Sequence, residues 1–282
     1  LQAQREELEH FYGLDREWHS RLPAMVVRVI TLDLGEARTL RSFKGSRNVT
    51  DLVLERLPYT MLLITTASVI TAVVGLWVGV KLATQVGKPI DRVISYFSAV
   101  SYAMPAWWAG ILMILIFAFE LRLLPAGGLY STPPPEGGLL RFLDLLWHSV
   151  LPVVTLVLVS LGAWIYTVRT MVLNTAQEFF VTVARAKGLP ETRVMRRYIM
   201  RVAAPPIVTN VVLGLAGSLG GAILTETVFN WPGMGRLYYD AVLAADENVL
   251  VALTFMFTLI YVTARFLLDV AYLVIDPRIR HS

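Results

Sequence analysis

The chain has 282 residues, of which 56% are hydrophobic and only 16% are charged, with a formal net charge of +4 at pH 7. Soluble domains carry about 25% charged residues, so this composition excludes an ordinary water-soluble globule. The absence of cysteine excludes a disulfide scaffold, and the excess of apolar residues excludes a disordered chain. The sequence therefore predicts a protein that crosses a membrane several times.

The first 56 residues are polar, with nine basic and nine acidic side chains. In this segment we expect a short amphipathic helix ending near Gly13, a second helix starting at Asp15, and a polar loop over Arg38–Arg47.

Five long stretches without charged residues follow. They are Leu57–Val80, Val93–Phe119, Leu145–Val168, Val202–Thr225 and Asn248–Ala264, the last continuing to Ile275 with only Arg265 and Asp269 interrupting it. About 20 apolar residues cross a membrane as a helix. The alternating ten-residue segments of a porin-like barrel are absent, so we predict an all-α polytopic membrane protein with five spans in this chain.

Basic residues mark the cytoplasmic side of membrane helices. They gather in the connections Lys81–Arg92 and Arg169–Arg201 and in the tail after Ile275, so we expect these parts in the cytoplasm. Residues 1–56 then lie outside. Because no signal peptide is visible at Leu1, we expect a sixth, N-terminal span before it in the full gene product.

Around the start of the third stretch, Arg141, Asp144 and His148 recur at helical spacing among apolar residues. This pattern predicts an amphipathic helix lying at the outer surface of the membrane.

Several residues in or beside the stretches leave a functional and a structural interpretation open. Pro105 lies in the second stretch beside Met104, Trp107 and Trp108, and a proline bends a helix, which suits either a helix lining the pathway or a structural kink. Glu226 follows the fourth stretch, where it is either a gate residue or a solvated helix end.

Small residues that permit close helix approach recur in two stretches. They are Gly75 and Gly79 in the first, and Gly214, Gly217, Ser218 and Gly221 in the fourth. For the fourth stretch, a moving partner interface and static packing both stay open. Arg265 and Asp269 are four apart in the last span, which favours an intramembrane ion pair over a solute site.

The connection between the third and fourth stretches has its own helical pattern. Gln177–Lys187 predicts a helix, Gly188 supplies a left-handed residue after it, and Pro190 prevents its continuation. Glu191–Arg201 predicts a second helix, after which Pro205 and Pro206 would begin the next span. The simpler alternative is an ordinary positive-inside loop.

Catalytic chemistry has little support in this sequence. The four histidines, His10, His19, His148 and His281, have no zinc-ligand spacing, and no phosphate-binding G-x-x-x-x-G-K-[ST] loop is present. We therefore predict no catalytic residue, no metal site and no cofactor in this chain. An ATP-independent secondary transporter remains an alternative, although such proteins usually carry several buried ionisable groups.

The segment Thr182–Leu189, followed by Arg197, Tyr198 and Pro206, resembles the cytoplasmic signature loop of binding-protein-dependent ABC importer permeases, in particular the oligopeptide/dipeptide branch. The general signature has Glu-Ala-Ala before its glycine. Thr182 stands in the place of that Glu here, and the oligopeptide/dipeptide branch usually lacks the Glu. Other matching segments are Gly13–Arg16, Leu32–Gly35, Leu54–Pro58, Met104–Gly110, Leu124–Gly128, Asn230–Leu237 and Asp276–Arg280.

The resemblance implies a type I ABC importer permease bundle in the cytoplasmic membrane of a prokaryote. Such a permease pairs with a second, homologous permease to form the pathway. An extracytoplasmic solute-binding protein delivers the solute, and two ATPase subunits bind ATP and Mg²⁺. The loop that couples to the ATPases would consist of Thr182, Val183, Ala184, Arg185, Ala186, Lys187, Gly188 and Leu189. No nucleic acid is expected as a partner.

The resemblance also implies a division of the chain: an extracytoplasmic segment 1–56, a transmembrane permease domain 57–275 with the coupling loop 169–204, and a cytoplasmic tail 276–282. The expected function is ATP-driven import of di- and oligopeptides, and relatives in the same class that carry oligosaccharides or nickel are the alternative.

Overall fold

The structure of the chain is a computed structural model that describes Val27, Thr31 and residues 33–218 and 223–275. The regular structure of this part is helical, apart from one isolated antiparallel bridge between Glu36 and Asn48, so the all-α prediction is confirmed. The helices predicted on either side of Gly13 and the tail 276–282 lie outside the described residues.

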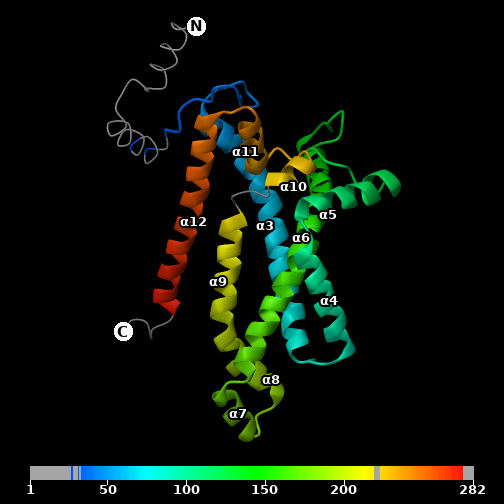
Figure 1. Cartoon of the computed structure of the whole chain (residues 1–282), viewed down its shortest axis with the longest axis vertical. Helices are drawn as coiled ribbons and strands as arrows, with labels where there is room; N and C mark the ends of the chain where they lie inside the picture. Colours follow the sequence, from blue (N-terminus) through cyan, green and yellow to red (C-terminus); the bar gives the residue numbers. More distant parts are fainter. Residues whose placement is uncertain (1–26, 28–30, 32, 219–222, 276–282) are drawn as a thin grey trace. The chain divides into compact units, whose positions relative to one another are not determined.

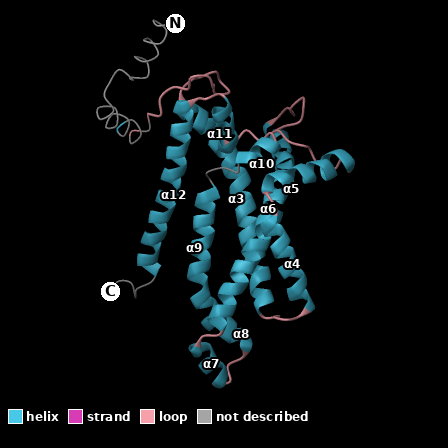
Figure 2. Ribbon diagram, in the orientation of Figure 1, coloured by secondary structure: helices cyan, strands magenta, loops and turns pink. Residues whose placement is uncertain are grey.

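The helices are labelled in Figure 1 and coloured as a class in Figure 2. The longer ones are α3 (Val49–Ala83), α4 (Pro89–Ala103), α6 (Gly138–Ala176), α9 (Met200–Ser218) and α12 (Glu247–Ile275). The shorter ones are α5 (Ala106–Met113), α7 (Phe179–Ala186), α8 (Glu191–Val194), α10 (Ile223–Val228) and α11 (Met234–Leu243), with two π-helical segments, η1 (Ile114–Glu120) and η2 (Met195–Ile199).

The chain forms two compact units. Unit 1 consists of Leu1–Glu55 and Asp240–Met256, and unit 2 consists of Arg56–Tyr239 and Phe257–Ser282. In unit 1, the predicted polar loop Arg38–Arg47 is indeed without helix. One carboxylate oxygen of the buried Asp246 accepts hydrogen bonds from the backbone N–H groups of Thr39 (2.9 Å) and Leu40 (3.3 Å), which fixes the start of this loop.

Within the described residues, three helices are long and apolar enough to cross a membrane: α3, α6, and α12 over Glu247–Val270. The pair α4 and α5–η1 makes a fourth if it is counted as one broken span. The expected fourth stretch, Val202–Thr225, covers most of α9 and the start of α10, and residues 219–222 between them lie outside the described part. Five spans are therefore not confirmed.

The second predicted span is broken rather than kinked. Met104 and Pro105 have extended backbones with ψ angles of 121° and 131°, and the two helical halves meet at 102°. Proline has no N–H to donate and forces the residue before it out of the helical conformation. The expectation of one continuous bent helix was wrong because both effects act at the same joint.

The predicted surface helix before the third span is also not a separate element. Gly137 has a φ of +95°, and from Gly138 a single helix of 39 residues, α6, continues through Pro152 into the span. Of the polar side chains that were expected to be exposed on this helix, two make contacts within the protein instead. His148 is buried, and the Asp144 carboxylate accepts hydrogen bonds from the backbone N–H (2.7 Å) and hydroxyl (2.8 Å) of Ser131.

Close approach of α3 to α6 confirms the interpretation of Gly75 and Gly79 as packing residues. A Cβ atom on Gly75 would lie 2.1 Å from Cδ1 of Trp164, and one on Gly79 would lie 2.8 Å from Cβ of Val168. The Trp164 indole N–H also donates to the carbonyl of Ala72 (3.2 Å). This pair of glycines serves static packing within one subunit. In the fourth stretch, a Cβ atom on Gly214 would meet open space, and the surroundings of Gly217, Ser218 and Gly221 lie outside the described residues.

The contact between α4 and α6 depends on a glycine that the sequence analysis did not single out. A Cβ atom on Gly162 would lie 2.6 Å from the backbone Cα of Ser98. One turn along α4, the Ser101 hydroxyl lies 2.6 Å from the carbonyl oxygen of Leu158 on α6. The backbones of α4 and α6 therefore lie close together at Gly162, and the Ser101 hydroxyl of α4 donates a hydrogen bond to α6.

Candidate functional site

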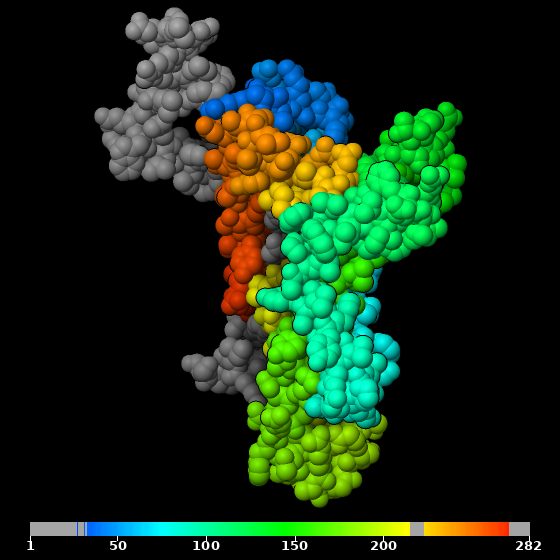
Figure 3. Space-filling view, turned by 45° about the vertical axis from the view of Figure 1, so that its right-hand side comes forward, coloured from blue at the N-terminus to red at the C-terminus, as the bar shows by residue number. Residues whose placement is uncertain are grey.

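We call Phe179–Val194 the α7–α8 loop. It protrudes at one end of unit 2, beyond the ends of α6 and α9, and the space-filling view shows it as an exposed tip (Figures 1 and 3). Gly188 has a φ of +72°, and its N–H donates to the carbonyl of Arg185 (2.9 Å), so the predicted left-handed residue after the first helix is confirmed.

The second predicted helix of this connection does not stop before the next span. It runs from Glu191 through α8, η2 and α9 to Ser218, with Pro205 and Pro206 inside α9. The expectation that the two prolines begin a new element was wrong, because the helix that starts at Glu191 continues through both of them. The α7–α8 loop is thus continuous with a long helix.

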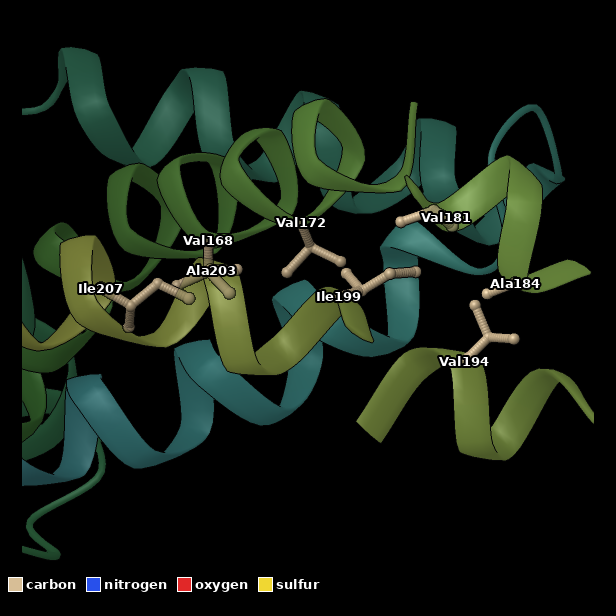
Figure 4. Close-up of a cluster of buried hydrophobic side chains, with 8 residues drawn as sticks. All are labelled: Val168, Val172, Val181, Ala184, Val194, Ile199, Ala203 and Ile207. Atoms are coloured by element: carbon tan, nitrogen blue, oxygen red, sulfur yellow. The ribbon is translucent and has the colours of Figure 1, made fainter. Parts of the chain in front are cut away.

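One face of the α7–α8 loop is buried in the bundle. Figure 4 shows apolar side chains from α7, α8, α6, η2 and α9 in one cluster: Val181, Ala184, Val194, Val168, Val172, Ile199, Ala203 and Ile207. Each of these residues is at most 4% exposed. Since proteins are packed densely, a cluster of this kind transmits displacement instead of absorbing it. The buried face of the loop is therefore packed against α6 and α9 in one cluster.

The opposite face of α7 is exposed. Phe179 is 79% exposed, and Thr182 and Ala186 lie on the same face at helical spacing. This face is uncharged and includes a large exposed aromatic side chain. The sequence analysis missed Phe179, although its position at the start of a short amphipathic helix was a signal that could have found it.

An ion pair closes the turn between α7 and α8. The guanidinium of Arg185 donates to both carboxylate oxygens of Glu191, at 2.7 and 3.2 Å. This hydrogen-bonded pair lowers the pKa of the Glu191 carboxyl and raises the pKa of Arg185. The bridge contributes stability that is present above the ordinary pKa of a glutamate and is lost as the pH falls through the lowered value.

The eight residues predicted to couple to ATPases are therefore divided between two faces. Ala184 is buried and Val183 and Leu189 are half-buried, whereas Thr182, Arg185, Ala186, Lys187 and Gly188 are exposed.

An ion pair between a buried carboxylate and a half-buried guanidinium connects α4 to the part of α6 that leads into the loop. Arg169 donates from Nε (2.8 Å) and Nη2 (2.9 Å) to the two carboxylate oxygens of Asp91, and the side chains are 18% and 7% exposed. Asp91 also accepts from the N–H of Gly87 (3.0 Å). The sequence analysis used these charges only to orient the helices, because sequence alone does not show which charges meet.

Glu226 is fully buried, so the interpretation as a solvated helix end was wrong. Its carboxylate accepts from the Thr60 hydroxyl (2.8 Å) and the backbone N–H of Arg236 (3.0 Å), and Thr60 in turn accepts from the N–H of Met234 (2.7 Å). The network joins α3, α10 and α11 through residues that all belong to unit 2.

The other predicted pathway residues surround the break between α4 and α5. Trp107 and Trp108 are 41% and 44% exposed, Pro105 is exposed and Met104 is half-buried. In the last span, Arg265 Nε lies 3.5 Å from Asp269 Oδ2, so the predicted pair lies within salt-bridge distance. Both side chains are more than half exposed, on the surface of α12.

Relatives of known function match nearly the whole chain. It is 28% identical over 280 residues to the oligopeptide transport system permease protein AppB of Bacillus subtilis (strain 168), covering 99% of this chain and 86% of that protein. It is 31% identical over 290 residues to the di/tripeptide transport system permease protein DppB of Pseudomonas aeruginosa (strain UCBPP-PA14), covering 98% and 85%.

A solved structure has the same fold. The inward-facing MetNI methionine ABC transporter contains a chain that matches with a TM-score of 0.58 at 17% identity, over 80% of this chain and 98% of that one. The family profile described as "Binding-protein-dependent transport system inner membrane component" matches residues 72–281. The signature loop, the fold and the full-length relatives agree, and the chain belongs to the family of inner-membrane permeases of binding-protein-dependent ABC transporters.

Proposed function

We propose that this chain is one of two permease subunits of an ATP-driven importer of di- and oligopeptides. The cargo is supported by the two full-length relatives, whose names state peptide transport. The mechanism is supported by one observation above all: the α7–α8 loop has an exposed face for a partner and a buried face inside the bundle.

In this proposal, an ATPase subunit receives the exposed face of α7 in a groove. Phe179, Thr182 and Ala186 make the contact, and Arg185 with Glu191 keeps the turn in shape. ATP and Mg²⁺ are bound by the ATPases and not by this chain. When the ATPases close, the loop moves as a unit, because Val181 and Ala184 are embedded in the cluster with α6 and α9. The permease then changes between inward-open and outward-open states.

For the topology we propose the arrangement that the distribution of basic residues predicts. The α7–α8 loop and the tail 276–282 lie in the cytoplasm, residues 1–56 lie outside, and residues 57–275 form the transmembrane domain with five spans. A solute-binding protein delivers the peptide from outside. Met104, Pro105, Trp107, Trp108 and Glu226 belong to the pathway or to its outer support, and Arg265 with Asp269 is a structural pair.

The contact with the ATPase is tested by Phe179→Ala in the transporter assembled with its own partner subunits. Removal of an exposed aromatic anchor at an interface costs more than about 1 kcal/mol, so we expect co-purification of the ATPases and ATP-driven uptake of labelled trialanine to fall about tenfold. The control is Leu139→Ala, which truncates a side chain that is 72% exposed at the opposite end of α6.

Equal effects of the two variants would contradict the docking role of α7. Import of oligosaccharides or Ni²⁺ by the wild-type assembly, without import of peptides, would contradict the proposed cargo.

A further inference from the structure

Helix α12 has little cover from the rest of the described chain. In its apolar window 17% of the residues are buried, compared with 28% in that of α3 and 33% in that of α6. Over half of the side chains from Glu247 to Val270 are exposed. A span packed so weakly against its own chain must be covered by lipid or by another protein, and the chemistry of its exposed side chains distinguishes the two.

One exposed side of α12 is polar. At 3.6 residues per turn, five exposed side chains fall within an arc of about 80° around the helix. They are Thr254, Thr258, Tyr261, Arg265 and Asp269, which we call the polar stripe. The side facing away from the stripe is exposed and mainly apolar, with Leu259, Phe266, Leu267 and Val270. Thr263 also lies there, and a threonine hydroxyl can bond to the preceding turn of its own helix.

The ion pair of the polar stripe lies within the apolar part of the span. At about 1.5 Å per residue, Arg265 and Asp269 are about 15 Å and 9 Å from Ile275, the last residue of α12. Arg265 Nε is 3.5 Å from Asp269 Oδ2, and the side chains are 56% and 57% exposed.

This contact leaves most of the hydrogen-bonding capacity of the pair unused. A guanidinium has five N–H donors, and among the described residues neither Arg265 nor Asp269 has a hydrogen-bond partner for its side chain. Lipid tails offer neither donors nor acceptors, and charged side chains in spans almost always face protein or water. The pair therefore needs a partner that the described part of the chain does not supply.

The position of the pair along the span selects among the possible partners. ATPases and a solute-binding protein work in the aqueous phases and do not reach side chains between the two membrane surfaces, whereas a second permease crosses the same membrane. Water is the other source of hydrogen bonds. However, two exposed valines, Val251 and Val262, line one edge of the polar stripe, and apolar side chains are covered better by protein than by water.

From these observations, and on the basis of the proposed function, we propose that the polar stripe is an interface with the second permease. The spans of that subunit supply acceptors for the guanidinium of Arg265 and donors for the carboxylate of Asp269. Polar side chains that bond across membrane helices hold the helices together, and a buried polar contact of this kind fixes the register of two subunits.

Cross-linking tests what covers the polar stripe. In the transporter co-expressed with its own subunits, Tyr261 is replaced by photoreactive p-benzoylphenylalanine. The matched control carries the same group at Leu267, which is 60% exposed on the other side of α12. We expect irradiation to join the Tyr261 variant to the second permease about tenfold more efficiently than the control. Equal cross-linking by the two variants, or cross-linking from position 261 only within its own chain, would overturn the proposal.

A thiol tests for water at the same stripe. The chain has no cysteine, so Thr258→Cys carries the only thiol in this subunit. In permeabilised cells it should resist a water-soluble maleimide, whereas Val86→Cys, in an exposed connection, should be labelled. Labelling of both variants to the same extent would place the stripe in water instead of at an interface.

Replacement of both charges tests the pair itself. Arg265→Leu combined with Asp269→Leu removes the groups that the second permease would bond, so the ratio of second permease to this chain after purification should fall about tenfold. Phe266→Leu combined with Val270→Leu changes two exposed positions at the same spacing on the apolar side and should keep the ratio. An unchanged or higher ratio in the first double variant would mean that the pair faces lipid, which would contradict the interface.

The two levels of the proposal fail differently. If the wild-type chain purifies without any second permease, the proposed function is wrong. If the two permeases assemble and the variants of the polar stripe behave as their controls, the proposed function stands and α12 does not form this interface.

Discussion

At the scale of single residues, Gly188 shows what the sequence can specify. Its φ of +72° is in the left-handed region that glycine enters without steric cost, and the helical pattern on both sides of it predicted this conformation correctly. Phe179 was missed for the opposite reason. Its position in a short amphipathic helix was a usable signal, but an apolar side chain in a membrane protein is expected to contact lipid or the core, and the structure places it on the exposed face of α7.

Replacement of Gly188 by alanine should uncouple the transporter. The left-handed conformation costs a residue with Cβ about 1 kcal/mol, so the turn between α7 and α8 would be shifted or strained. We expect fewer peptides imported per ATP hydrolysed, measured in vesicles together with the thermal unfolding midpoint.

The matched control is Gly45→Ala, because Gly45 has a φ of +85° with no atom within 4 Å of an added Cβ, in a loop of unit 1. It should lose similar stability and keep the normal ratio of transport to hydrolysis. The same loss of coupling in both variants would mean that stability alone explains the effect.

At the scale of helices, apolar composition predicted where most of the long elements lie but not where they stop. Nothing between Gly138 and Ala176 breaks the helix, so the expected surface helix and the span became one element. At Met104 and Pro105 the two dihedral restrictions coincide, and the expected bend became a turn of 102°. The contact of α4 with α6 was not predictable, because a charge pattern does not show that Asp91 meets Arg169.

The Asp91–Arg169 pair should contribute considerably more to the free energy of unfolding than the exposed Arg185–Glu191 pair in the α7–α8 loop. Removal of one partner leaves a largely shielded charge without its hydrogen bonds, which costs about 1–3 kcal/mol, so Asp91→Asn and Arg169→Gln should each destabilise the protein measurably. The double variant should lose less than the sum of the two, by about 1–3 kcal/mol, in thermal or denaturant unfolding of the purified protein.

The comparison is the cycle of Arg185→Gln and Glu191→Gln, whose side chains are 45% and 59% exposed. Exposed pairs contribute about 0–1 kcal/mol, so this cycle should show a much smaller coupling. Equal coupling energies in the two cycles would show that burial of the Asp91 pair has no special weight.

At the scale of the whole chain, the family and the all-α class could be predicted from the sequence, because they depend on composition and on a motif order that spans the chain. The number of crossings could not, because it depends on whether α4 and α5–η1 together reach the other side of the membrane. The sequence shows how many apolar residues a stretch contains. Whether the stretch crosses the membrane also depends on the direction in which its helices run.

The absence of cysteine from the chain makes this question accessible to labelling, since a single introduced thiol is the only one present. Glu136→Cys and Val86→Cys place a thiol in exposed connections on the two sides of the bent pair. We expect a membrane-impermeant maleimide to label the first in intact cells and the second only after permeabilisation. Labelling of both from one side would mean that the pair enters and leaves the membrane on the same face.

The turn at Met104 has one more consequence. α4 has 15 residues and is therefore about 22 Å long, which is less than the roughly 30 Å of hydrocarbon that a typical bilayer presents. Because α5 and η1 run at 102° to it, they add little length along the axis of α4. If α4 stands along the membrane normal, the bilayer beside this corner is therefore expected to be thinner than average.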